Sequence, residues 1–192
     1  MRLAVPPLEG RRVRLEPLAE THREPLRRAA EDERLWAFTL TRGMGPGFDP
    51  WLDDALRQSD GGVRVPFAVR RLSDDTLVGS SSYLDVAIAE GRVEIGSTWY
   101  TRDEWGTATN PECKLLLLAH AIDVLGVNRV ALVTDLLNTR SQSAIAKLGA
   151  TREGVLRAHK ISQGGRVRDT VVFSIIKAEW PAARAGLLAR LA

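Results

Sequence analysis

Cysteine, histidine and long apolar runs are all scarce in this chain of 192 residues. The single cysteine, Cys113, cannot form an internal disulfide and fits a reducing compartment, so a cytoplasmic location is expected. The three histidines lie far apart in the sequence without metal-ligand spacing, and no metal site is expected. No apolar run reaches the roughly 18 residues of a membrane span, and residues 1–10 lack the apolar core of a signal peptide.

Charge of one sign is also scarce, because the formal net charge is only +3. Nucleic-acid binding would need a denser basic stripe with interleaved aromatic residues, so no nucleic-acid partner is expected. One basic cluster lies beside two strand-like runs: Arg152, Arg157, His159, Lys160, Arg166 and Arg168. These side chains either cover solvated strand faces or form a local positive field for an anionic cofactor tail or an acidic partner.

The length and composition are typical of one globular domain spanning residues 1–192. The hydrophobic periodicity predicts strands at 13–18, 63–72, 77–88, 93–100 and 129–134, and a final hairpin of 151–161 with 166–176. Helices are expected at 22–31, about 50–58, 113–125, 139–148 and about 178–191. This order indicates an α/β fold with a mixed, mostly antiparallel sheet.

The segment from Asp103 to Glu112 joins a strand-like run to a strongly apolar helix. Asn110 is a good N-cap, and Pro111 fits the first helical position, where a missing N–H costs nothing. The first turn of such a helix presents free N–H groups and the positive end of the helix dipole, which favour phosphate. The segment is therefore either a phosphate loop or only a tight connection.

Four short segments, in this order, resemble the GCN5-related N-acetyltransferases (GNAT), and within them the RimJ/RimL-like branch: Val93-Glu94-Ile95-Gly96, Trp105 to Asn110, Asn138-Thr139-Arg140-Ser141 and Ala144 to Ala150. The resemblance implies a single-domain GNAT fold with helices on both faces of the sheet. It also implies a cytoplasmic enzyme that binds acetyl-CoA and acetylates a primary amine by direct attack on the thioester. A homodimer is considered as its assembly state. The cofactor positions that it implies are Trp99, Tyr100, Thr101, Trp105, Gly106, Thr107, Ala108, Thr109, Asn110, Asn138 and Ser141.

In the family, the phosphate loop usually reads Gln or Arg, then any two residues, then Gly, then any one residue, then Gly or Ala. This chain departs from that pattern. Trp105, Ala108 and Asn110 occupy the three marked positions. Alanine is tolerated there if its φ is negative and strained if its φ is positive. The alternative function is therefore a non-catalytic acyl-CoA sensor or scaffold on the same fold.

Acetyl transfer to an amine needs a base for the ammonium and a proton for the departing thiolate. Glu94 lies on a strand with apolar neighbours, where burial would raise its pKa and make it a candidate base. It could equally face solvent or pair with an arginine, and His159 or water could act instead. Ser141, in the first turn after the cap residue Asn138, is the candidate acid, although both residues could simply cap their helix.

Aromatic side chains gather in and beside the loop between the first two helices, at Trp36, Phe38, Phe48 and Trp51. They could contact the acceptor amine or belong to the core. Trp36, Phe38 and His159 are taken as the substrate contacts. A peptide or protein N-terminus, an aminoglycoside-like drug, a polyamine and an amino acid all stay open as acceptors.

Overall fold

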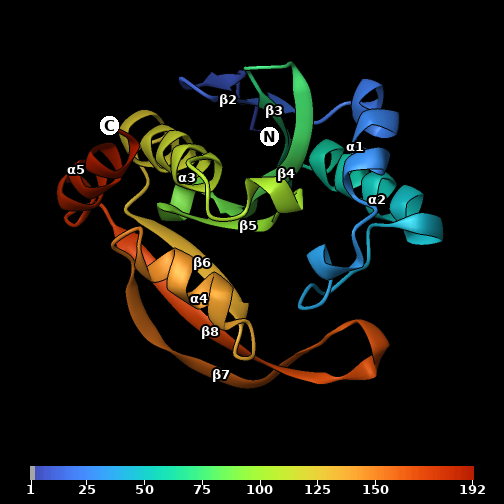
Figure 1. The fold of residues 1–192 in the computed structure, drawn as a ribbon. Helices are drawn as coiled ribbons and strands as arrows, with labels where there is room; N and C mark the ends of the chain where they lie inside the picture. Colours follow the sequence, from blue (N-terminus) through green and yellow to red (C-terminus); the bar gives the residue numbers. More distant parts are fainter. Residues whose placement is uncertain (1–2) are drawn as a thin grey trace.

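One eight-stranded sheet organises residues 3–192, the part of the chain that the computed structural model describes (Figure 1). The strand order is β1-β2-β3-β4-β5-β6-β8-β7, and only β5 and β6 are parallel neighbours. The mixed, mostly antiparallel sheet is therefore confirmed. The strands are β1 (Leu8–Glu9), β2 (Val13–Pro17), β3 (Arg64–Arg71), β4 (Thr76–Ala87), β5 (Arg92–Tyr100), β6 (Arg129–Asp135), β7 (Thr151–Ile161) and β8 (Val167–Ile176).

Helices cover both faces of the sheet, as alternate residues of β3 show. Phe67 and Val69 belong to a core cluster that includes Leu117 of α3, whereas Ala68 belongs to a second cluster with Leu26 of α1 and Leu52 of α2. The two faces of one strand are thus buried by different helices. The helices are α1 (Arg23–Ala29), α2 (Phe48–Asp60), α3 (Thr109–Ala119), α4 (Thr139–Ala146) and α5 (Trp180–Leu191).

The sheet divides between β5 and β6. Their parallel pairing covers only residues 92–94 and 129–131, although β5 continues to Tyr100 and β6 to Asp135. Figure 1 shows the two halves of the sheet spreading apart beyond this short ladder. A bulge in β5 adds to the divergence, since the register against β4 shifts between Ser80 and Ser82, and Ser97 has a φ of +46°. A wedge therefore opens in the middle of the sheet.

The start of α3 differs from the sequence prediction. The helix begins at Thr109 after Ala108, so Asn110 is not its N-cap and Pro111 is not its first residue. The N-cap is Ala108, and Thr107 before it supports this earlier start, because its hydroxyl accepts the Thr109 N–H at 3.2 Å. The C-terminal end of the helix agrees better with the sequence prediction. The helix continues as a π-turn through residues 120–124 and stops at Gly126, whose φ is +71°.

Glu112 fastens α3 to the N-terminal strands. Its carboxylate is 4% exposed and accepts hydrogen bonds from the backbone N–H groups of Arg11, Arg12 and Val13, each at 2.9 Å. Three charge-assisted bonds to one buried carboxylate make this a strong local anchor. The anchor fixes the first turn of α3 against the N-terminal strands.

Candidate active site

A cavity of about 710 Å³ occupies the wedge between β5 and β6. Its walls come from β5, the end of β6, the loop before α3 together with the first turn of α3, helix α4, the loop at residues 34–41 and the β7–β8 hairpin. Gln163, at the tip of that hairpin, donates a hydrogen bond to the Trp36 carbonyl, so the hairpin reaches across to the aromatic loop. The cavity is therefore enclosed by segments distant in the sequence.

The predicted phosphate loop forms one side of this cavity through Trp105, Gly106, Thr107 and Asn110. The first turn of α3 leaves the N–H groups of Ala108 and Asn110 without an intrahelical acceptor. Gly106 has a φ of +81°, which favours glycine. The loop thus offers free backbone donors at the positive end of a helix dipole.

Buried Glu104 supports the loop from behind. One of its oxygens lies 2.5 Å from Arg71, and the other accepts hydrogen bonds from the hydroxyls of Thr107 and Thr109. Ala108 has a φ of −73°, a conformation that alanine adopts without strain. The departure from glycine at position 108 is therefore compatible with an ordered loop.

Three of the predicted cofactor residues lie outside the walls of the large cavity. Ala108 and Thr109 line a smaller groove of about 450 Å³, together with Arg11 and Arg12, on the other side of the loop. Thr101 precedes the loop, and its N–H is bonded to the Val78 carbonyl. The remaining predicted residues, including Trp99, Tyr100, Asn138 and Ser141, do line the cavity.

Sequence reasoning missed several cations of the cavity wall, among them Arg140, Lys147 and Arg190 on the side of α4 and α5. The Arg140 guanidinium lies 3.3 Å from the centre of the Trp105 ring, and Arg190 donates to the Lys147 carbonyl at 2.7 Å. Arg140 and Lys147 belong to segments that carried the family resemblance, but Arg190 has no sequence signal. Together they place positive charge on the α4 and α5 side of the cavity.

Lys114 is another residue that sequence reasoning missed. It is 5% exposed, lines the cavity from α3, and donates to the hydroxyls of Thr98 at 2.8 Å and Ser81 at 3.3 Å. Burial lowers the pKa of its ammonium to about 8. These hydrogen bonds hold the bulged part of β5 against α3.

Glu94 lies at the position where the β5–β6 ladder ends, half-buried in the cavity wall. In the described part of the chain its carboxylate has neither a hydrogen bond nor an ion pair, so it is not a paired strand residue. Burial raises the pKa of Glu94, while the nearby Lys160 and Arg168 act in the opposite direction and Asp85 adds to the rise. An unpaired carboxylate with a raised pKa is suited to accept a proton.

Ser141 and Asn138 line the cavity from the other side of the wedge. The Asn138 side chain accepts the Ser141 N–H at 3.0 Å, which confirms Asn138 as the cap of α4. Because α4 follows β6 directly, the first turn of α4 lies at the wedge and lines the same cavity as Glu94.

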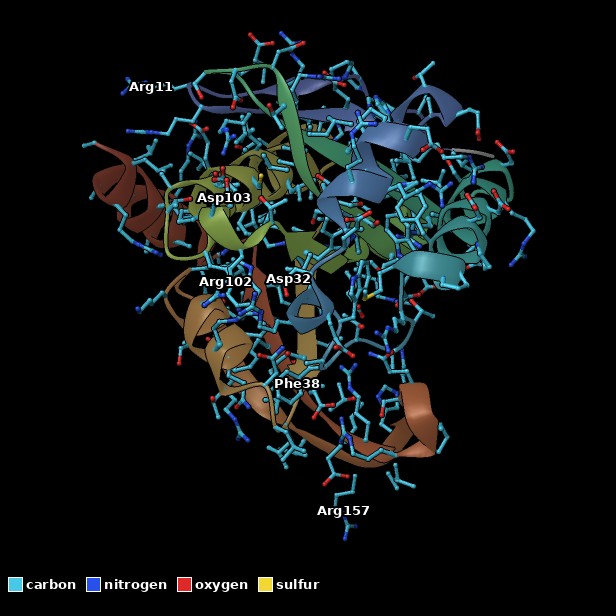
Figure 2. The ribbon with its side chains drawn as sticks, turned by 45° about the vertical axis from the view of Figure 1, so that its right-hand side comes forward. Arg11, Asp32, Phe38, Arg102, Asp103 and Arg157 are labelled. Carbon is cyan, nitrogen blue, oxygen red and sulfur yellow. The ribbon has the colours of Figure 1, made fainter. Side chains whose placement is uncertain are left out.

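The predicted substrate contacts divide into three cases. Trp36 is 2% exposed, packs 5.3 Å from Trp99 between ring centroids, and donates to the Ala30 carbonyl, so it is a core residue that reaches the cavity wall. Phe38 is 37% exposed and lines the cavity, where Figure 2 shows it between the two halves of the molecule. His159 is exposed on β7 and lies outside the cavity wall, whereas its neighbour Lys160 is part of that wall.

Within residues 3–192, no helix is both long and apolar enough to cross a membrane. The same range holds no group of three or more His, Cys, Asp or Glu side chains placed to bind a metal ion.

Solved structures similar to this chain include several acetyltransferases. A GCN5-related N-acetyltransferase from Brucella melitensis has a TM-score of 0.87 at 31% identity, covering 97% of this chain and 85% of that chain. Mycobacterium smegmatis RimJ in complex with CoA-disulfide has a TM-score of 0.80, covering 96% of this chain and 92% of that chain. At 22% identity, RimJ shows a shared fold only.

Sequence comparison agrees with the structural one. The chain is 29% identical over 123 residues to the uncharacterized N-acetyltransferase YoaA of Bacillus subtilis (strain 168), covering 64% of this chain and 67% of YoaA. The family model described as Acetyltransferase (GNAT) domain matches residues 12–151, which is most of the chain. The chain therefore belongs to the GNAT family of acetyltransferases.

Proposed function

We propose that this protein transfers the acetyl group of acetyl-CoA to a primary amine by direct attack of the amine on the thioester. One observation carries the proposal: Glu94 and Ser141 line one cavity from the two sides of the wedge in the sheet. A candidate base and a candidate acid thus flank the space in which an acceptor and a thioester could meet.

The cavity suits the chemistry of CoA along its length. The first turn of α3 and the cations Arg140, Lys147 and Arg190 would hold the phosphates of the cofactor. Beyond residues 94 and 131 the facing edges of β5 and β6 do not pair with each other, so their backbone groups are free to bond the amides of the pantetheine arm. RimJ, with the same fold, has been solved with CoA-disulfide, which supports this assignment.

The residues of the chain would then act in sequence. Glu94 accepts a proton from the acceptor ammonium, directly or through water, and so produces the attacking amine. As the C–S bond breaks, Ser141 donates a proton to the thiolate, and it is reprotonated by the proton that the acceptor nitrogen loses when the amide forms. Phe38 and the loop around it wall the side on which the amine enters.

The test of the proposal is thiol release from acetyl-CoA in the presence of a panel of primary amines. Calorimetric titration with CoA, run in parallel, measures binding separately from turnover. Amine-dependent thiol release supports the transferase. CoA binding without release on any amine would instead support a non-catalytic acyl-CoA sensor.

Ser141→Ala should lower kcat by about 10²-fold, the usual scale for one general acid–base group, with little change in KM for acetyl-CoA. The substitution leaves the Asn138 cap and the Ser141 N–H in place. Steady-state kinetics measure the effect, with Thr139→Ala on the exposed face of α4 as the control. A change confined to KM would show that Ser141 positions the cofactor and that water protonates the thiolate.

Gly106→Pro should weaken CoA binding by about 10²-fold or more. Proline fixes φ near −65°, whereas Gly106 has a φ of +81°, so the loop must rearrange, and the substitution also removes an N–H donor. Ala108→Gly is the matched control and should keep the affinity, because Ala108 already has a negative φ. Isothermal titration with CoA gives both values. Wild-type affinity in a folded Gly106→Pro protein would exclude the loop from the cofactor site.

A further inference from the structure

Two cations stand directly opposite each other in the part of the cavity wall that the β7–β8 hairpin forms. Lys160 of β7 and Arg168 of β8 are register partners in the hairpin, and both line the cavity. Side chains at such positions lie close together on one face, and like charges there repel. This repulsion costs stability, and a negative group held between the two cations would relieve it.

Arg168 is buried without adequate partners. It is 6% exposed, and its Nε has no hydrogen-bond acceptor among residues 3–192. The closest carboxylate oxygen, on Asp135, is 3.9 Å away, and Asp135 is already bonded to Arg166 and to the Leu137 N–H. A buried guanidinium with an unmet donor is costly, and an incoming anion would satisfy it.

The remainder of the basic cluster does not share this arrangement. Arg166 is paired with Asp135, and Arg152 and Arg157 are exposed on β7. Figure 2 shows Arg157 projecting from the far end of the molecule into solvent. Among the residues of this cluster, all of which lie in the described part of the chain, Arg168 and Lys160 are the two that line the cavity.

Both cations share the cavity wall with Glu94 and interact with it electrostatically. Burial lowers the pKa of Arg168, and Asp135 and Glu94 both act against that shift. Lys160 in turn acts on the ionisation of Glu94. The cavity wall therefore combines one carboxylate with two cations, which matches a molecule that carries both an ammonium and a carboxylate.

We propose that Arg168 and Lys160 bind a carboxylate of the acceptor, so that the acceptor class is an amine with a nearby carboxylate, as in an amino acid or a peptide whose first residue is acidic. This inference rests on the proposed function. Arg168 would form charge-assisted hydrogen bonds to the carboxylate, and Lys160 at the rim would add a second positive charge. Glu94 would then face the ammonium that it deprotonates.

The test compares kcat/KM for matched acceptors that differ only in charge: glycine against glycinamide, and aspartyl-alanine amide against asparaginyl-alanine amide. The first pair reports a free α-carboxylate and the second an acidic side chain. Arg168→Gln and Lys160→Gln should each reduce the ratio of acid to amide by about 10- to 100-fold in the preferred pair. Because the ratio is compared between proteins, the intrinsic reactivity of each amine cancels. Arg157→Gln, on the exposed part of β7, is the matched control and should keep the wild-type ratio.

A binding measurement keeps the inference separate from catalysis. In the presence of CoA, the wild-type protein should bind the N-acetylated acid of the preferred pair at least about tenfold more tightly than its amide, and Arg168→Gln should remove that difference. CoA affinity, measured alone, reports whether the variant instead affects the cofactor phosphates. Lys160→Gln at the exposed rim gives a second readout if Arg168→Gln does not fold.

The outcomes separate the two proposals. Turnover of amines with the same acid-to-amide ratio in wild-type protein and in both variants would overturn the carboxylate site and leave the transferase intact. Loss of CoA affinity in Arg168→Gln with an unchanged acceptor ratio would also overturn it. Selective binding of N-acetylated acids without turnover of any amine would support the carboxylate site and contradict the transferase. Failure to bind either acetylated compound, with no turnover, would overturn both.

Discussion

Glu94→Gln should lower kcat/KM for acetyl transfer by about 10²- to 10³-fold near neutral pH, within the range expected for loss of a general base. The substitution preserves the shape of the side chain and removes its ability to accept a proton. Glu94 has no ion pair to lose in the described part of the chain, so the fold should be retained. The KM for acetyl-CoA should change little.

The effect of Glu94→Gln on kcat/KM should depend on pH in a definite direction. Burial raises the pKa of Glu94, so the wild-type rate should rise with pH through a pKa above the ordinary value of about 4.3 for glutamate. Above the pKa of the acceptor, the amine is already deprotonated and needs no base. The deficit of the Gln variant should therefore shrink as pH increases.

A pH–rate profile of kcat/KM on an amine that turns over measures both effects. Glu90→Gln serves as the control and should follow the wild-type profile. It makes the same change from carboxylate to carboxamide at an exposed residue just before β5. If Glu94→Gln also keeps the wild-type profile, Glu94 is a structural strand residue, and water becomes the candidate base, because His159 lies outside the cavity wall.

Glu112→Ala should lower the free energy of unfolding by about 3–5 kcal/mol, the scale for removing a partner from a buried charged network. The Glu112 carboxylate accepts three backbone N–H groups, and alanine would leave those of Arg11, Arg12 and Val13 without their acceptor. Glu112→Gln should cost less, because its amide oxygen can still accept hydrogen bonds.

Urea unfolding followed by circular dichroism measures these differences. Glu33→Ala, at an exposed carboxylate, is the control and should change the stability by no more than about 0.5 kcal/mol. A loss below about 1 kcal/mol for Glu112→Ala would show that the N-terminal strands do not depend on this anchor.

Local sequence patterns were sufficient to predict the order of helices and strands along the chain. Alternating apolar residues and turn residues lie within each strand or hairpin, so the meander of β3 to β5 and the β7–β8 hairpin could be predicted from short windows. The cap at Asn138 was also predictable, because the residue and the N–H that it accepts are three positions apart. The start of α3 was not. The Thr107 hydroxyl accepts the N–H of Thr109 at the start of the helix, and Glu104, fixed by Arg71 of β3, holds Thr107 in place.

In the candidate site, too, some features could be predicted from short segments and others depend on the tertiary structure. Glu94 and Ser141 could be named from short segments, but their shared cavity depends on where the β5–β6 ladder ends, which is a property of the whole sheet. Trp36 was named as a substrate contact, whereas packing against Trp51 and Trp99 makes it largely core.

The sequence by itself determined the order of elements, the family resemblance and the candidate acid and base, because each depends on residues close together in the chain. Only the tertiary structure decided which cations enter the cavity. In β7, residues 157–159 bulge opposite Asp169, and Ala158 has a φ of +48°. The bulge breaks the alternation of a regular strand, so position along the sequence could not show that Lys160, and not His159, lines the cavity beside Arg168.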